Sequence, residues 1–87
     1  MRNLQDTIEY HINFARALRK SNDMEKRSNL DSEFCREVTA KEWERYRDKH
    51  NITCMITSPY YNSEKYFNQI DEEYRLWLII QMKLKLQ

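Results

Sequence analysis

The chain has 87 residues, of which 40% are hydrophobic and 33% charged, with no glycine, one proline and a formal net charge of +1. Because glycine supplies the positive φ angles and close backbone approaches of phosphate-binding loops, its absence excludes the Walker A loop, the dinucleotide fingerprint and the nucleophile elbow. The near balance of charge excludes a strongly basic or acidic chain, and the length predicts one helical domain over residues 1–87.

A first helix is predicted over residues 4–20. Asn3 is its expected N-cap, and the basic residues near its end suit the negative end of the helix dipole. The polar run Ser21-Asn22-Asp23 ends this helix and caps a second one over residues 24–37, whose apolar stripe is thin. The apolar face of the first helix follows three- and four-residue steps through Leu4, Ile8, Ile12, Ala15 and Leu18.

The best local signal in the chain precedes a third helix. Thr39 stands three residues before Glu42, which is the spacing of a capping box. This pattern predicts a helix that begins at Ala40. Asn51 is expected to end it by taking the left-handed conformation, which is the usual role of glycine.

A stretch without helical periodicity separates the third helix from the last one. Its β-branched residues and its proline favour extended backbone, near residues 52–60. The last helix, capped by Asn62 or Ser63, begins near Glu64, and its segment Leu76–Ile80 is apolar on every side. The alternating tail after that segment is typical of either a strand or a helix end. The expected fold is all-α, with about four helices in a small bundle and one extended loop.

Metal binding and catalysis find little support in the sequence. Two histidines and two cysteines match the ligand count of a zinc site, but only His50 and Cys54 are close in sequence, so no metal site is expected. His11 and Cys35 are isolated, and His11 is interpreted as a helix-face residue. A thiol nucleophile needs a base and an orienting group, which no spacing here supplies. We therefore expect no catalytic residue, no cofactor and no enzymatic activity.

Nucleic-acid binding is the alternative function. Lys41, Arg45 and Lys49 stand four residues apart and form a basic stripe on the third helix, a pattern typical of phosphate contacts. The acidic residues Glu42, Glu44 and Asp48 lie between them and weaken the attraction to a polyanion unless they face away. A small RNA- or DNA-binding module that uses this helix face stays open beside the main prediction.

Protein binding has more support, because aromatic residues crowd the last third of the chain. Trp, Tyr and Arg dominate interface energetics, and a domain this small cannot bury all of its rings. The all-round apolar segment also needs cover, from a second copy in a homo-oligomer or from another protein. The competing interpretation is that several of these rings form the core. The expected partner-binding residues are Tyr61, Tyr66, Tyr74 and Trp77, with Arg45 and Arg47 as polar partners.

The sequence carries no membrane or export signal. No run approaches the roughly 20 apolar residues that span a bilayer, so no membrane span is expected. Residues 1–6 are followed by no apolar signal core, and two cysteines suit a reducing compartment. The expected location is the cytoplasm.

The chain resembles a group of small phage proteins. It starts Met1-Arg2-Asn3-Leu4-Gln5 and carries the segments Arg47–Thr53 and Tyr74–Leu78 in a glycine-poor background rich in Asn, Lys, Ile and Tyr. In this style it is similar to the cytoplasmic early and accessory proteins of T-even-type bacteriophages, the lysis-inhibition accessory proteins among them. The resemblance implies a non-enzymatic regulator or inhibitor that binds and restrains another protein, such as a host factor, a defence enzyme or the phage holin. It assigns no functional residue.

Overall fold

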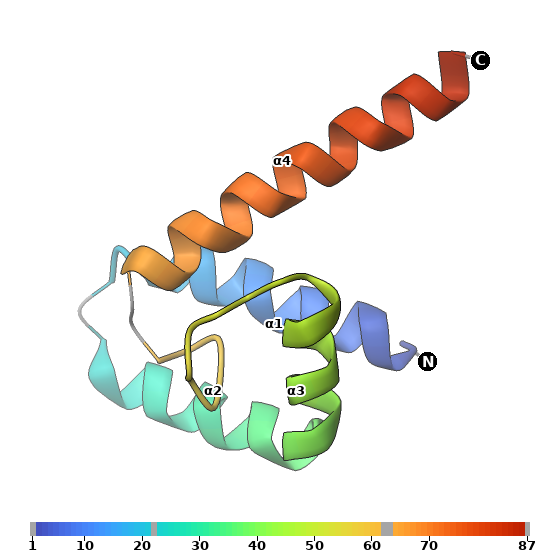
Figure 1. Cartoon of the computed structure of the whole chain (residues 1–87). Helices are drawn as coiled ribbons and strands as arrows, with labels where there is room; N and C mark the ends of the chain where they lie inside the picture. The colour runs from blue at the N-terminus through green and yellow to red at the C-terminus, as the bar shows by residue number, and fades with distance from the viewer. Residues whose placement is uncertain (1, 22, 62–63, 87) are drawn as a thin grey trace.

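The computed structural model describes residues 2–21, 23–61 and 64–86, and over these residues the chain forms four helices and no strand. The predicted all-α fold is therefore confirmed. In Figure 1, α1, α2 and α3 surround the loop that follows α3, and α4 lies across α1. The helices are α1 (Leu4–Leu18), α2 (Met24–Glu37), α3 (Ala40–Lys49) and α4 (Glu64–Leu86).

Local side-chain hydrogen bonds begin the first two helices where the sequence predicted. The Asn3 side chain accepts a bond of 2.8 Å from the backbone N–H of Asp6, and Asp23 accepts one of 3.0 Å from Lys26. Each bond satisfies one of the N–H groups that a helix start leaves without an intrahelical partner. The predicted caps of α4, Asn62 and Ser63, lie outside the described residues.

The end of α1 lies at Leu18 rather than at the predicted Lys20. Arg27 of α2 crosses to this end and donates to the carbonyl oxygen of Arg19 at 2.9 Å and to that of Ser21. These carbonyl oxygens would otherwise lack hydrogen-bond donors at the helix terminus. The Arg27 side chain thus provides hydrogen bonds for carbonyl groups just beyond the end of α1.

Both ends of α3 follow the prediction. Thr39 Oγ1 accepts from the Glu42 backbone N–H at 3.2 Å, and Glu42 Oε1 accepts from the Thr39 backbone N–H at 2.9 Å. This reciprocal pair is the capping box. Asn51 has a φ of 56°, so it takes the left-handed conformation beyond the helix end.

Replacing Thr39 with alanine is expected to lower the free energy of unfolding by about 1 kcal/mol, because the start of α3 loses its side-chain acceptor. Urea denaturation followed by circular dichroism measures this change. Thr57→Ala is the matched control, since Thr57 is an exposed threonine in the loop. Equal losses in the two variants would contradict a specific role for the cap.

The Glu42 carboxylate also makes the capping box sensitive to acid. Hydrogen bonds from Thr39, first from its backbone and then from its side chain, lower the pKa of the Glu42 carboxyl below its ordinary value of 4.5. A carboxyl whose folded-state pKa is lowered stabilises the fold above the unfolded pKa, and this stabilisation is lost as the pH falls through the folded value. The free energy of unfolding of Glu42→Gln should therefore be lower than that of wild type at pH 7. This difference should shrink as the pH falls below about 4.5.

The core joins one face of α1 to aromatic residues from every other element. Phe34 lies edge-on to Trp43 with ring centroids 5.3 Å apart, and Trp43 lies edge-on to Tyr66 at 6.2 Å. Edge-to-face rings at these distances attract each other beyond their burial alone. The buried apolar cluster comprises Ile8, Ile12, Ala15, Leu18, Phe34, Val38, Trp43, Ile52, Tyr60, Tyr66, Phe67 and Ile70.

The predicted loop between α3 and α4 is present as irregular backbone. Trp43 Nε1 donates to the carbonyl oxygen of Ile56 at 3.0 Å, which ties the loop to α3. Gln69 of α4 donates to the carbonyl oxygen of Asn51 at 2.6 Å. Side chains from two helices thus bind carbonyl groups that have no strand partner, and Tyr60 at the far end of the loop is buried in the core.

The second half of α4 leaves the body of the protein. Its first half packs on the core through Tyr66, Phe67 and Ile70, whereas its red end in Figure 1 extends past the other three helices. The alternating tail is helical as far as Leu86, which settles the choice between strand and helix. We call residues 76–86 the arm. None of the helices in the described ranges has the length and hydropathy needed to cross a membrane.

Candidate docking surface

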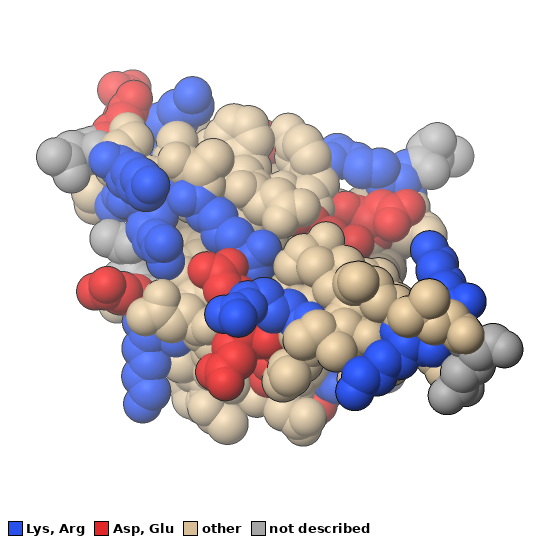
Figure 2. Space-filling model, turned by 90° about the horizontal axis from the view of Figure 1, so that it is seen from above, with Lys and Arg blue, Asp and Glu red and all other residues tan. Residues whose placement is uncertain are grey.

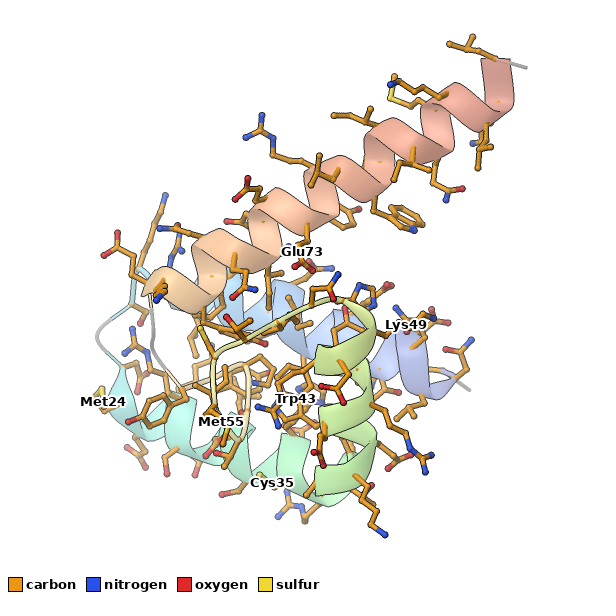
Figure 3. The ribbon with its side chains drawn as sticks, viewed as in Figure 1. Met24, Cys35, Trp43, Lys49, Met55 and Glu73 are labelled. Carbon is orange, nitrogen blue, oxygen red and sulfur yellow. The ribbon has the colours of Figure 1, made fainter. Side chains whose placement is uncertain are left out.

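The arm is apolar and uncovered. Its large apolar side chains are between 39% and 86% exposed, and in Figure 3 the side chains of this end of α4 point to all sides of the helix. An apolar helix surface of this kind normally packs against a core or a partner. The eight exposed side chains are Leu76, Trp77, Leu78, Ile79, Ile80, Met82, Leu84 and Leu86.

Helical spacing divides the arm, together with Tyr74 just before it, into two stripes. One stripe continues the buried face of α4 beyond Ile70, and we call it the inner stripe. The other lies on the opposite side of the helix, and we call it the outer stripe. The inner stripe comprises Tyr74, Trp77, Gln81 and Leu84, and the outer stripe comprises Leu76, Ile79, Met82 and Leu86.

The root of the arm is fixed to α1. Arg16 Nε forms an ion pair of 2.7 Å with Asp71 Oδ1, and the Arg16 guanidinium lies 5.8 Å from the centre of the Tyr74 ring. Tyr74 in turn stacks on Trp77, with ring centroids 6.0 Å apart and an angle of 16° between the planes. These contacts hold the start of the inner stripe in a defined position over α1.

A cavity of about 540 Å³ opens beneath this root, between α4, α1 and the C-terminal end of α3. Its lining is mixed: the apolar and aromatic residues are Ile12, Tyr46, Ile52, Ile70, Tyr74 and Trp77, and the polar and charged residues are Gln5, Glu9, Asn13, Arg16, Lys49, His50 and Glu73. Figure 3 shows Glu73 on the side of α4 that faces the end of α3. The inner stripe therefore begins as the roof of this cavity and then continues into free solution.

Burial favours the neutral forms of three titratable groups in the cavity wall. Burial, with a smaller effect from the charge of Glu72, raises the pKa of the Glu73 carboxyl. Burial, with a smaller effect from Lys49, lowers the pKa of His50, and burial raises the pKa of Tyr46 to about 12. Desolvation is the largest cause in all three cases.

The structure separates the predicted aromatic anchors into two groups. Tyr61, Tyr74 and Trp77 are 65%, 50% and 50% exposed, so these rings are accessible to a partner. The prediction that Tyr66 is a surface anchor is wrong, because Tyr66 is 0% exposed. It lies on the face of α4 that packs on the core beside Trp43. For this ring the competing interpretation, that it forms part of the core, is correct.

The predicted polar partners also divide. Arg45 is exposed on α3. Arg47 is half-buried, and its Nη1 donates to the carbonyl oxygen of Cys54 at 3.1 Å. We therefore correct the assignment of Arg47: its guanidinium holds the loop of this chain and is not a free surface group.

The basic stripe of the alternative function is exposed. Lys41, Arg45 and Lys49 all lie on the surface of α3, but Glu44 and Asp48 of the same helix are exposed as well. The face seen from above in Figure 2 likewise carries acidic and basic side chains next to each other. Nucleic-acid binding through this stripe stays a prediction, since mixed charge weakens attraction to phosphates.

Sequence reasoning missed the role of His11. It is a residue of the α1 face, as interpreted from the sequence, but that face is buried and His11 is 0% exposed. Its Nδ1 lies 2.7 Å from Tyr60 Oη and its Nε2 lies 2.5 Å from Glu37 Oε2. The signal was present, since position 11 lies inside the apolar spacing of the first helix, but its buried partners are distant in sequence.

His11 also belongs to a group of possible metal ligands. Within the described part of the chain, its ring and the carboxylates of Glu33 and Glu37 place their ligand atoms within 4.8 Å of one another. Both ring nitrogens already have protein partners. Through these two hydrogen bonds the buried imidazole joins α1 to α2 and to the loop.

The two cysteines differ from an activated nucleophile. Burial, with a smaller effect from Asp31, raises the pKa of Cys35, so less of this exposed thiol is thiolate at neutral pH. Cys54 is half-buried, and its Sγ lies 3.8 Å from Gln69 Oε1.

No protein-family model, no curated protein and no solved structure matches the chain. The resemblance to phage accessory proteins accordingly stays a prediction that depends on the segments quoted above.

Proposed function

We propose that this protein is a non-enzymatic regulator or inhibitor that binds another protein stoichiometrically, with the arm as its docking element. The observation that carries the proposal is the exposure of eight large apolar side chains on one projecting helix end. None of them belongs to the buried apolar cluster of the body. The resemblance to phage accessory proteins supports the same class of function, with a host, defence or lysis protein as the partner.

The outer stripe suits the recognition of a helix in a groove. At 1.5 Å per residue the arm is about 16 Å long, which provides three turns of helix. Leu76, Ile79, Met82 and Leu86 follow three- and four-residue steps, which is the spacing of anchors that enter an apolar groove. Fully burying a side chain of this size contributes about 1.5–3 kcal/mol. The partner implied by this chemistry has an apolar groove with acidic groups near the lysines of the arm.

Replacing Ile79 with glutamate is expected to weaken capture of the partner by about tenfold or more, because a charge would enter the apolar contact. The free energy of unfolding should change by no more than about 0.5 kcal/mol, since Ile79 is far from the core. Affinity purification with quantitative mass spectrometry compares the proteins retained by wild type and by the variant.

Met55→Glu is the matched control for this experiment. Met55 is an apolar side chain that is 93% exposed, and it lies in the loop rather than on the arm. The proposal expects a protein that wild type and Met55→Glu retain and Ile79→Glu loses. An identical set of retained proteins for all three chains would rule out the outer stripe as the docking element.

A further inference from the structure

The inner stripe is a core face that loses its cover partway along the helix. Ile70 is 6% exposed, whereas Tyr74 and Trp77 one and two turns later are each 50% exposed, and Leu84 is 60% exposed. The outer stripe faces away from the body at every position, but the inner stripe continues a packed surface directly. Its natural occupant is an apolar helix that follows α4 and reaches the cavity below its root.

The charges along α4 specify the direction of such a helix. Asp71 and Glu73 precede the apolar segment, and Lys83 and Lys85 follow it. The midpoint between Asp71 and Lys85 is residue 78, and the midpoint between Glu73 and Lys83 is the same residue. Two parallel copies of α4 would therefore place like charges together, whereas two antiparallel copies place each acid level with a lysine.

We propose that the inner stripe binds the inner stripe of a second copy of this chain, with the two arms antiparallel and centred near Leu78. This inference rests on the proposed function, because it assigns an occupant to one side of the same arm. The paired segment runs from Asp71 to Lys85, and at 1.5 Å per residue it is about 21 Å long. The outer stripe stays accessible in this arrangement.

The cavity fits this arrangement. With the arms centred near Leu78, Leu84 of the second copy comes within about one helical turn of Tyr74, at the mouth of the cavity. Tyr74 and Trp77 give the mouth an apolar edge, and the charged residues Glu9, Arg16, Lys49 and Glu73 also line the cavity. Lys85 of the incoming arm lies beside the paired face and reaches the root, where Asp71 has further acceptor capacity beside its ion pair with Arg16.

A charge-swap experiment tests the pairing and its direction. One chain carries Lys83→Glu and Lys85→Glu, and the other carries Asp71→Lys and Glu73→Lys, so that each acid level with a lysine is exchanged. Each variant alone should self-associate about tenfold or more weakly than wild type, because like charges then face each other. An equimolar mixture should restore association as a one-to-one heterodimer. Sedimentation equilibrium with a mass label on one chain measures both results, and circular dichroism checks that both variants are helical.

The possible outcomes separate this inference from the proposed function. A wild-type chain that sediments as a monomer up to about 1 mM overturns the pairing, as does a mixture of variants that fails to associate. If such a monomer still loses its captured protein on Ile79→Glu, the proposed function stands alone. If wild type forms the expected dimer and Ile79→Glu captures the same proteins as wild type, the pairing stands and the proposed function fails.

Discussion

Phe34→Ala is expected to lower the free energy of unfolding by about 3–5 kcal/mol. Phe34 is 1% exposed, and its ring lies edge-on to both His11 and Trp43, with centroids 5.3 Å away in each case. Truncation removes these contacts and leaves a cavity that the surrounding rings fill only in part. Because small domains are stable by about 5–15 kcal/mol in total, the loss is a large part of the stability of this fold.

Urea denaturation of Phe34→Ala and of Phe14→Ala provides the comparison. Phe14 is a phenylalanine of α1 that is only half-buried against the same cluster, so its truncation should cost clearly less. The slope of the transition should remain that of a cooperative two-state unfolding. Losses of similar size in both variants would show that the aromatic junction around Phe34 is not the centre of the core.

His11→Ala is expected to cost about 3 kcal/mol, which combines the cavity with the loss of two hydrogen bonds. The imidazole is the one buried group that contacts both Tyr60 Oη and the Glu37 carboxylate among the described residues. Its removal leaves the Tyr60 hydroxyl without this partner in a buried position. The loop and α2 should therefore lose a shared attachment to α1.

A double-mutant cycle with Tyr60→Phe tests this junction. The cost of Tyr60→Phe should be smaller in the His11→Ala background, with a coupling energy of about 0.5–3 kcal/mol. Tyr61→Phe is the matched control, since Tyr61 is the next tyrosine in the chain and is 65% exposed. Additive effects for His11 and Tyr60, like those expected for His11 and Tyr61, would contradict the junction.

The helix starts could be predicted because their causes are local. Thr39 and Glu42 are three residues apart, and so are Asn3 and Asp6, so each cap depends on atoms that are neighbours in the sequence. Asn51 likewise takes its positive φ within the turn it terminates. Interactions of this range leave spacing patterns that can be read without knowledge of the fold.

The candidate site could be predicted only in part. Tyr66 and Trp77 both belong to the aromatic last third of the chain, yet one is fully buried and the other half-exposed. Their local sequences do not distinguish them. The difference arises because the body covers α4 only as far as about Ile70, and that limit depends on the positions of α1 and α3.

The sequence by itself determined the helical class, the first three helix starts and the presence of an unusually apolar segment at residues 76–80, since each follows from composition or short-range spacing. Only the tertiary structure decided that this segment projects from the body, that Tyr66 and Arg47 serve the chain's own packing, and that His11 joins Tyr60 to Glu37. These outcomes depend on contacts between residues far apart in the chain, and whether a side chain is buried depends on what other elements bring to it.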